Sequence, residues 1–230
     1  MNSYIYHELI EHRNLKFSRV YANNVSFNCI LDMYKFYKIE IPSKFKHVGQ
    51  KKILEFLLGR IALHYQQDKY QYYFDLKNGR YGQPLWPSPF LGSISHSMIS
   101  NNSGIAVSYL NSTNHHVGID IELKKNSLLL KDDENILNQF LKNTEKENVK
   151  SLINKHSLLY LIIFSSKESI IKAVFSKYQV LINFHDIEFL VINSCNGKIS
   201  FKLKKPFVVE IDAYFLILSE DIISYCILEH

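Results

Sequence analysis

The chain is organised around the stretch Val117-Gly118-Ile119-Asp120-Ile121-Glu122. Apolar residues alternate with the two acids, and successive side chains of a β-strand point to opposite faces, so the pattern predicts a buried strand. Asp120 and Glu122 share one face, with Cα atoms roughly 6.6 Å apart at ~3.3 Å rise per residue, so both carboxylates can reach one cation. Alternating acids more often form only the solvated face of a strand, and a metal site therefore needs support from elsewhere in the chain.

A second stretch predicts a helix that adds a third acid and an ammonium group. It reads Phe164-Ser165-Ser166-Lys167-Glu168-Ser169-Ile170-Ile171-Lys172-Ala173. It lies within residues 158–175, where apolar side chains recur at the spacing of one helix face. Glu168 and Lys172 are four residues apart on another face, and taken alone they most simply form a surface ion pair. Combined with the acidic strand, they suit a site for a divalent cation and a phosphorylated substrate.

The composition is that of a folded protein of one large domain or two small ones. The chain has 230 residues, of which 47% are hydrophobic, with 8 Gly and 5 Pro, and this excludes a disordered or fibrous protein. The net charge of +5 permits an anionic partner but is too small to require nucleic acid, and we expect none. The three cysteines are far apart and lack a C-x-x-C pairing, which argues against a disulfide framework or a zinc site.

We expect a cytoplasmic protein without a signal peptide or membrane span. Glu8, Glu11, His12 and Arg13 interrupt any apolar core of a leader sequence. The longest strongly apolar run, residues 158–164, is far shorter than the roughly 20 residues that cross a bilayer.

Helical and strand patterns mix along the rest of the chain, which predicts an α/β (α+β) fold. Residues 26–37 fit either a strand or a short helix, and residues 47–66 predict a helix that carries Arg60 in a basic stripe. Three strands are predicted in the middle of the chain, the second and third paired as a hairpin: residues 91–97, 104–110 and 115–123. Four further strands are predicted to form a mainly antiparallel sheet against the long helix: residues 180–190, 198–203, 207–218 and 222–229.

Five stretches, in this order, resemble the 4'-phosphopantetheinyl transferases, in particular the enterobactin-synthetase type of siderophore pathways. They are EFLLGR (55–60), GQPLWP (82–87), GSISHS (92–97), GIDIE (118–122) and FSSKESIIKA (164–173). Each is short enough to arise by chance, whereas the ordered set is much harder to dismiss.

The resemblance implies an enzyme that transfers the 4'-phosphopantetheine arm of coenzyme A to a serine of an apo acyl or peptidyl carrier protein, releasing 3',5'-ADP. It implies two similar α/β halves with a pseudo-twofold relation, residues 1–118 and 119–230, with coenzyme A between them. The first half would contact coenzyme A phosphates, and the second would carry the metal site and the catalytic helix. We expect a monomer whose positive charge suits acidic carriers. Siderophore and nonribosomal peptide synthesis follows from the subfamily alone, so fatty acid and polyketide carriers stay open.

Residue by residue, the resemblance assigns the chemistry to the two opening stretches. Asp120, Glu122 and Glu168 would hold Mg²⁺, whose preferred ligands are oxygens. Glu168 would also serve as general base for the carrier serine, directly or through a water molecule. Lys172 would lie near the pyrophosphate and neutralise or protonate the leaving phosphate.

Four further residues are expected to contact coenzyme A phosphates. Arg60, His96 and Lys167 match family positions, and His96 would meet the 3'-phosphate. Ser95, beside His96, would complete a phosphate cradle. The sequence departs from the family after Arg60, where residues 61–64 lack a further arginine that is common there.

Two other hypotheses compete with transfer. The first is a module that binds coenzyme A or a carrier protein without catalysis, but such a module has no need of three acids together with Lys172. The second is a different Mg²⁺-dependent enzyme that acts on nucleotides, which should prefer ATP to coenzyme A.

Overall fold

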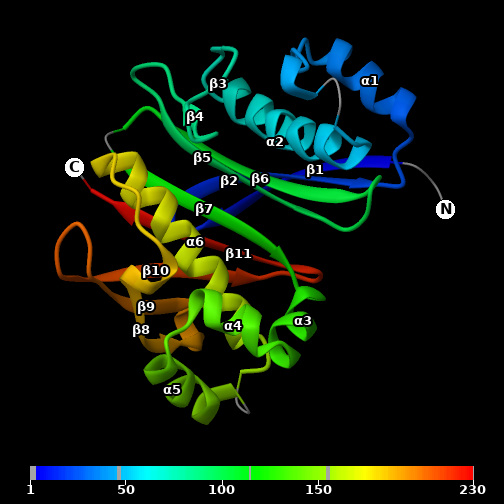
Figure 1. Cartoon of the computed structure of the whole chain (residues 1–230). Helices are drawn as coiled ribbons and strands as arrows, with labels where there is room; N and C mark the ends of the chain where they lie inside the picture. Colours follow the sequence, from blue (N-terminus) through cyan, green and yellow to red (C-terminus); the bar gives the residue numbers. More distant parts are fainter. Residues whose placement is uncertain (1–3, 46–47, 114, 154–155, 230) are drawn as a thin grey trace. The chain divides into compact units, whose positions relative to one another are not determined.

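The computed structural model describes residues 4–45, 48–113, 115–153 and 156–229. The chain divides into two compact units, Met1–Thr113 and Asn114–His230, called here unit 1 and unit 2 (Figure 1). Each unit is an antiparallel sheet with one long helix packed against it. This agrees with the predicted α/β class.

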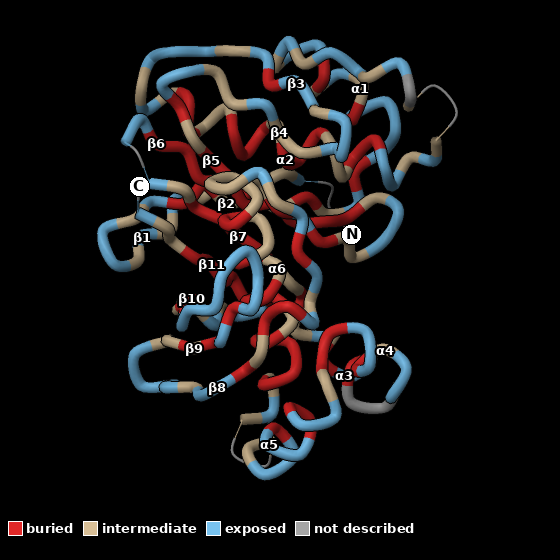
Figure 2. Tube along the Cα trace, turned by 60° about the vertical axis from the view of Figure 1, so that its left-hand side comes forward, coloured by how far each residue is buried: buried red, intermediate tan, exposed pale blue. Residues whose placement is uncertain are grey.

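Unit 1 is a four-stranded sheet in the order β1-β2-β6-β5, and α2 packs on β2, β5 and β6. Its core is formed by the apolar face of α2, including Leu54, Leu57 and Ile61, and by β6, which is buried along its whole length (Figure 2). Its elements are β1 (Tyr4–His12), β2 (Leu15–Asn23), α1 (Phe27–Phe36), η1 (Ser43–Phe45), α2 (Gln50–Asp68), β3 (Lys77–Asn78), β4 (Pro84–Leu85), β5 (Leu91–Met98) and β6 (Gly104–Asn111).

The structure decides the ambiguous segment 26–37, which is the helix α1. The Ser26 hydroxyl accepts a hydrogen bond from the backbone N–H of Cys29 and caps its first turn. The prediction of a helix over residues 47–66 corresponds to α2, although His47 lies outside the described residues.

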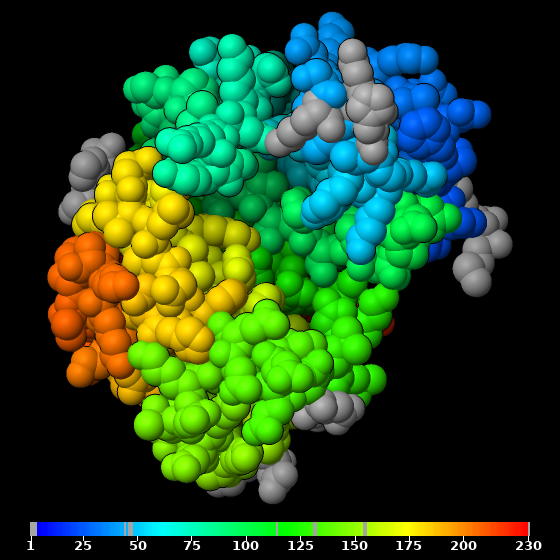
Figure 3. Space-filling view, viewed as in Figure 1, coloured from blue at the N-terminus to red at the C-terminus, as the bar shows by residue number. Residues whose placement is uncertain are grey.

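Unit 2 is a five-stranded sheet in the order β7-β11-β10-β9-β8, covered by α6 on β7, β11 and β10. In Figure 3 the green side chains of α4 and α5 lie against the yellow ones of α6. Its elements are β7 (His116–Leu123), α3 (Asn126–Asp132), α4 (Glu134–Phe140), α5 (Asn143–Ile153), α6 (Leu159–Tyr178), η2 (Phe184–Asp186), β8 (Ile187–Asn193), η3 (Ser194–Asn196), β9 (Lys198–Leu203), β10 (Val209–Ile217) and β11 (Asp221–Leu228).

The predicted hairpin between residues 104–110 and 115–123 is wrong. Both segments are strands, but β6 pairs with β2 and β5, whereas β7 pairs with β11 from the end of the chain. In that register Asp120 lies opposite Ser224 and Glu122 opposite Ile222. β11 is buried over Asp221–Cys226, and such burial can outweigh proximity in sequence. The acidic strand is therefore an edge strand of the second sheet.

Across the described ranges, none of the helices has the length and apolar character needed to cross a membrane.

Candidate active site

The acidic strand and the long helix meet through a glycine. A Cβ atom added to Gly118 would lie 1.9 Å from the carbonyl oxygen of Ser169 and 2.5 Å from the backbone nitrogen of Ala173. Real Cβ atoms essentially never approach other atoms this closely, so the backbone of α6 packs directly on β7 because residue 118 has no side chain. This contact brings the acids of β7 next to the motif of α6.

Asp120 faces α6 and is only 4% exposed. Its Oδ1 accepts a hydrogen bond of 2.7 Å from Lys172 Nζ, which also donates to the carbonyl oxygen of Ile119 at 3.0 Å. Its Oδ2 accepts a hydrogen bond of 2.9 Å from the Ser165 hydroxyl. The solvated-face interpretation of this acid is therefore wrong, because both carboxylate oxygens are bound inside the protein.

A second serine extends this contact into the sheet. The hydroxyl of Ser224 on β11 lies 2.6 Å from that of Ser165, and both side chains are fully buried. Since the single proton of Ser165 is donated to Asp120, Ser224 must donate to Ser165. Sequence analysis did not assign these two serines a role. Ser165 lies within the helix motif, but Ser224 enters the site only through the pairing of β7 with β11.

Glu168 lies on the same face of α6 as Lys172, one turn before it, and is partly buried. Burial raises the pKa of the Glu168 carboxyl, the nearby ammonium of Lys172 lowers it, and the negative charge of Asp120 raises it further. A carboxylate with a raised pKa is a better proton acceptor than an ordinary one. The i,i+4 relation that the sequence predicts is thus part of a three-residue charge cluster, in which Lys172 bonds Asp120.

The third acid, Glu122, is partly exposed at the end of β7. Its Oε2 accepts a hydrogen bond of 2.9 Å from the side-chain amide of Asn126, the first residue of α3. Within the part of the chain that the structure describes, no three His, Cys, Asp or Glu side chains are grouped closely enough to hold a metal ion. The three acids supply the oxygen donors that Mg²⁺ prefers, and the charge of Asp120 raises the pKa of Glu168. In donor chemistry they fit Mg²⁺, while the ammonium of Lys172 now neutralises Asp120.

Lys167 is not part of this cluster, which corrects its predicted phosphate contact. Its side chain is 0% exposed and its ammonium lies 2.7 Å from Glu145 Oε1, inside unit 2. Burial lowers the pKa of Lys167 to about 8, an effect that the charge of Glu145 opposes. A missed signal lay in the sequence, because Lys167 is four residues after Ile163 and three before Ile170, on the buried face of the helix.

His96 and Ser95 lie in unit 1 on β5. His96 is exposed and its Nδ1 is 3.0 Å from Oε1 of Glu55 on α2. The other carboxylate oxygen of Glu55, Oε2, forms an ion pair of 2.7 Å with Lys52. Ser95 is 5% exposed and points to the opposite face of the strand, since successive side chains alternate. The predicted cradle of Ser95 and His96 side chains is therefore incorrect.

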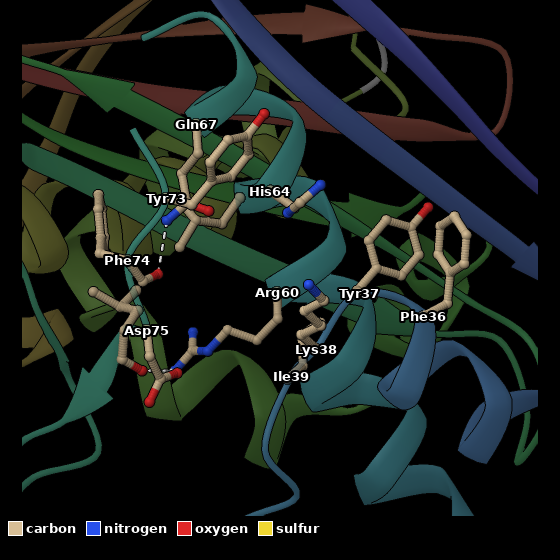
Figure 4. Close-up of a pocket in the computed structure, with 12 residues that line it drawn as sticks. Phe36, Tyr37, Lys38, Ile39, Arg60, His64, Gln67, Tyr73, Phe74 and Asp75 are labelled. Carbon is tan, nitrogen blue, oxygen red and sulfur yellow. Dashed lines mark hydrogen bonds between the residues drawn. The ribbon is translucent and has the colours of Figure 1, made fainter. Parts of the chain in front are cut away.

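Arg60 lines a cavity in unit 1 with a volume of about 450 Å³ (Figure 4). Its Nη2 donates to the carbonyl oxygen of Leu76 at 3.0 Å and to Asn78 Oδ1 at 2.7 Å, while its buried Nε finds no acceptor among the described residues. Burial lowers the pKa of Arg60 to about 10, and the charge of Asp75 opposes this. Lys38 lies on the same cavity with several aromatic rings: Phe36, Tyr37, Tyr73 and Phe74.

Comparison with known proteins accounts for both units. Residues 116–217 match the model of the 4'-phosphopantetheinyl transferase superfamily, and residues 42–101 match that of the 4'-phosphopantetheinyl transferase N-terminal domain. Enterobactin synthase component D of Escherichia coli (strain K12) is 30% identical over 151 residues, which cover 66% of this chain and 68% of that relative. The chain belongs to the 4'-phosphopantetheinyl transferase superfamily.

The same component of Escherichia coli O157:H7 and of Shigella flexneri is 29% identical over the same length. In the present chain, Asp120, Glu168 and Lys172 lie within the region that matches the superfamily model. Arg60 and His96 lie within the region that matches the N-terminal domain model. The predicted family, enzyme class and α/β fold are confirmed.

Proposed function

We propose that this enzyme transfers the 4'-phosphopantetheine arm of coenzyme A to a serine of an apo carrier protein in an Mg²⁺-dependent reaction. The observation that carries the proposal is the group of Asp120, Glu168 and Lys172 at the contact of β7 with α6. It provides a proton acceptor of raised pKa and a fixed ammonium side by side. Both are needed when a hydroxyl displaces a phosphate ester.

In the proposed reaction the serine oxygen attacks the β-phosphorus of coenzyme A. The new P–O bond forms as the bond to the bridging oxygen breaks, and 3',5'-ADP leaves with that electron pair. Glu168 accepts the hydroxyl proton, directly or through water. The Lys172 ammonium, held by Asp120 Oδ1, would interact with a phosphate oxygen.

Asp120, Glu122 and Glu168 would hold the Mg²⁺ ion. When bound, the ion would neutralise pyrophosphate oxygens and so stabilise the charge of the transition state. Support comes from the donor chemistry of the three acids and from the charge repulsion between Asp120 and Glu168.

Arg60 and His96 are the proposed contacts of the coenzyme A phosphates. The Nε of Arg60, which has no acceptor among the described residues, and the cation of Lys38 on the same cavity favour an anionic group there. The aromatic rings of the cavity suit a nucleotide base. Lys167 and Ser95 are not proposed as phosphate contacts. Lys167 is fully buried with Glu145, and Ser95 lies on the opposite face of β5 from His96.

The proposed partners belong to siderophore or nonribosomal peptide synthesis. Support comes from the names of the relatives, enterobactin synthase component D, at about 30% identity.

A mass-shift assay tests the activity. The enzyme is incubated with coenzyme A, Mg²⁺ and a panel of apo carriers from siderophore, polyketide and fatty acid synthesis, and the carrier serine should gain the mass of the arm. Glu168→Gln and Asp120→Asn should abolish the gain while circular dichroism stays unchanged, and chelation of Mg²⁺ should stop the wild type. Absence of added mass on every carrier would contradict the activity, and full activity of either variant would show that the site is misplaced.

A further inference from the structure

A fully buried ion pair joins Lys167 of the catalytic helix α6 to Glu145 of α5. Lys167 Nζ donates to Glu145 Oε1 at 2.7 Å, to the carbonyl oxygen of Phe140 at 2.7 Å and to that of Phe184 at 3.4 Å. An ammonium has three N–H donors, so each has an acceptor. The acceptors come from α5, the last residue of α4 and the first residue of η2.

Glu145 connects the pair to two more backbone segments. Its Oε1 also accepts the backbone N–H of Phe189 on β8 at 2.8 Å, and its Oε2 accepts that of Lys142, just before α5, at 2.9 Å. The carboxylate is 1% exposed. One ion pair therefore fixes α6 to the segments on its side away from β7.

The two sides of α6 are held by different contacts. Ser165 lies two residues before Lys167, roughly 200° around the helix, and bonds Asp120 on β7. On that side the backbone of α6 also presses on Gly118. Viewed down the helix axis, Glu168 lies at an angle between Lys167 and Ser165. The direction of its side chain therefore depends on how the helix is rotated.

Stability alone is a poor explanation for such a pair. Removing two charges from water costs several kcal/mol per ion, and well-packed apolar residues of similar volume are often as stabilising. A charged pair with directional acceptors also restricts the helix that carries it to one position, because each hydrogen bond is lost if the helix turns.

We propose that the Lys167–Glu145 pair positions the catalytic helix, setting its rotation so that Glu168 and Lys172 face Asp120. Lys167 is then a positioning residue that does not contact coenzyme A. This inference rests on the proposed role of Glu168. A misplacement of about 1 Å in a reacting group can cost up to about 100-fold in rate.

The test compares Lys167→Met and Glu145→Gln with Ile163→Ala, a fully buried position one turn earlier on α6 that has no part in the ion pair. Each variant is assayed at a temperature where circular dichroism shows it folded, with a carrier that the wild type modifies. We expect kcat of both pair variants to fall about ten- to a hundredfold, with KM for coenzyme A changed less than about twofold. The double variant should be no slower than the worse single one, because both changes break one contact. Ile163→Ala should lose thermal stability and keep its kcat.

Two outcomes overturn the inference: folded pair variants with wild-type kcat, or an equal loss of kcat in Ile163→Ala. If Lys167→Met does not fold, Glu145→Gln decides, because it removes the charge that pairs with Lys167 and one of the two acceptor oxygens, while a carbonyl oxygen remains for the backbone N–H of Phe189. Glu168→Gln in the same assay separates the two hypotheses. An active Glu168→Gln removes the proposed catalytic role, whereas an inactive one beside fully active pair variants removes the positioning role alone.

Discussion

Glu168 combines a cost in stability with the proposed gain in activity. Burial raises the pKa of its carboxyl, so the folded protein binds a proton more readily than the unfolded chain. The charged Glu168 therefore lowers the stability of the folded protein, and this loss is complete once the pH is above the folded pKa. Below the pKa of the unfolded chain the carboxyl is protonated in both states, and the loss is absent. We expect Glu168→Gln in metal-free buffer at pH 7 to unfold a few degrees higher than the wild type while losing transfer activity. The difference in melting temperature should shrink as the pH falls through the raised pKa of the Glu168 carboxyl, where the wild type gains its proton. A variant that melts lower than the wild type at pH 7 would contradict this account.

Two adjacent serines of α6 offer a matched pair of substitutions. Ser165 donates to Asp120, whereas the buried hydroxyl of Ser166 has no hydrogen-bond partner among the described residues. Ser165→Ala removes the donor that orients Asp120, and we expect about 1–3 kcal/mol less stability in urea unfolding and at least about tenfold less activity. Ser166→Ala removes an unpaired polar group and should be neutral or stabilising. Equal losses in the two variants would show that the hydroxyl of Ser165 has no special role.

At the scale of elements, the contact of β7 with α6 decides the geometry of the site. Gly118→Ala places a methyl group where the carbonyl oxygen of Ser169 now lies, so strand and helix must separate. We expect a loss of about 1–3 kcal/mol or more in unfolding free energy, and loss of transfer activity, since Asp120 and Lys172 move apart. Gly49→Ala is the control, because an added Cβ there has no atom within 4 Å and its φ is −68°. Wild-type activity in Gly118→Ala would mean that this close approach does not hold the site.

Periodicity predicted α2, α6 and the strand character of β7, because each pattern lies within a few consecutive turns or residues. Periodicity did not relate Asp120 to Glu168 and Lys172; the ordered motifs did, and in the structure Lys172 lies 2.7 Å from Asp120. The β6–β7 hairpin was wrong, since the partner of β7 lies about a hundred residues later, at Asp221–Leu228. The burial of Lys167 was missed for the same reason, because its partner Glu145 belongs to a separate helix. The cavity at Arg60 likewise combines α1, α2 and residues 73–76, which no local pattern relates.

At the scale of the whole molecule, the net charge of +5 acts on the approach of the carrier protein. Opposite charge raises the rate of encounter more than it changes chemistry within the complex, and salt screens it, with a Debye length of about 10 Å at 0.1 M and about 3 Å at 1 M. For a carrier with an acidic surface, we therefore expect kcat/KM to fall severalfold between 0.05 and 0.5 M salt while kcat changes little. Steady-state kinetics at saturating coenzyme A and varied carrier measures both, and keeps the salt dependence of coenzyme A binding out of the comparison. A carrier variant with its surface acids changed to amides is the matched control, and its kcat/KM should start lower and depend less on salt. If both carriers respond equally to salt, the positive charge of the enzyme does not guide carrier binding, and apolar contact must select the partner.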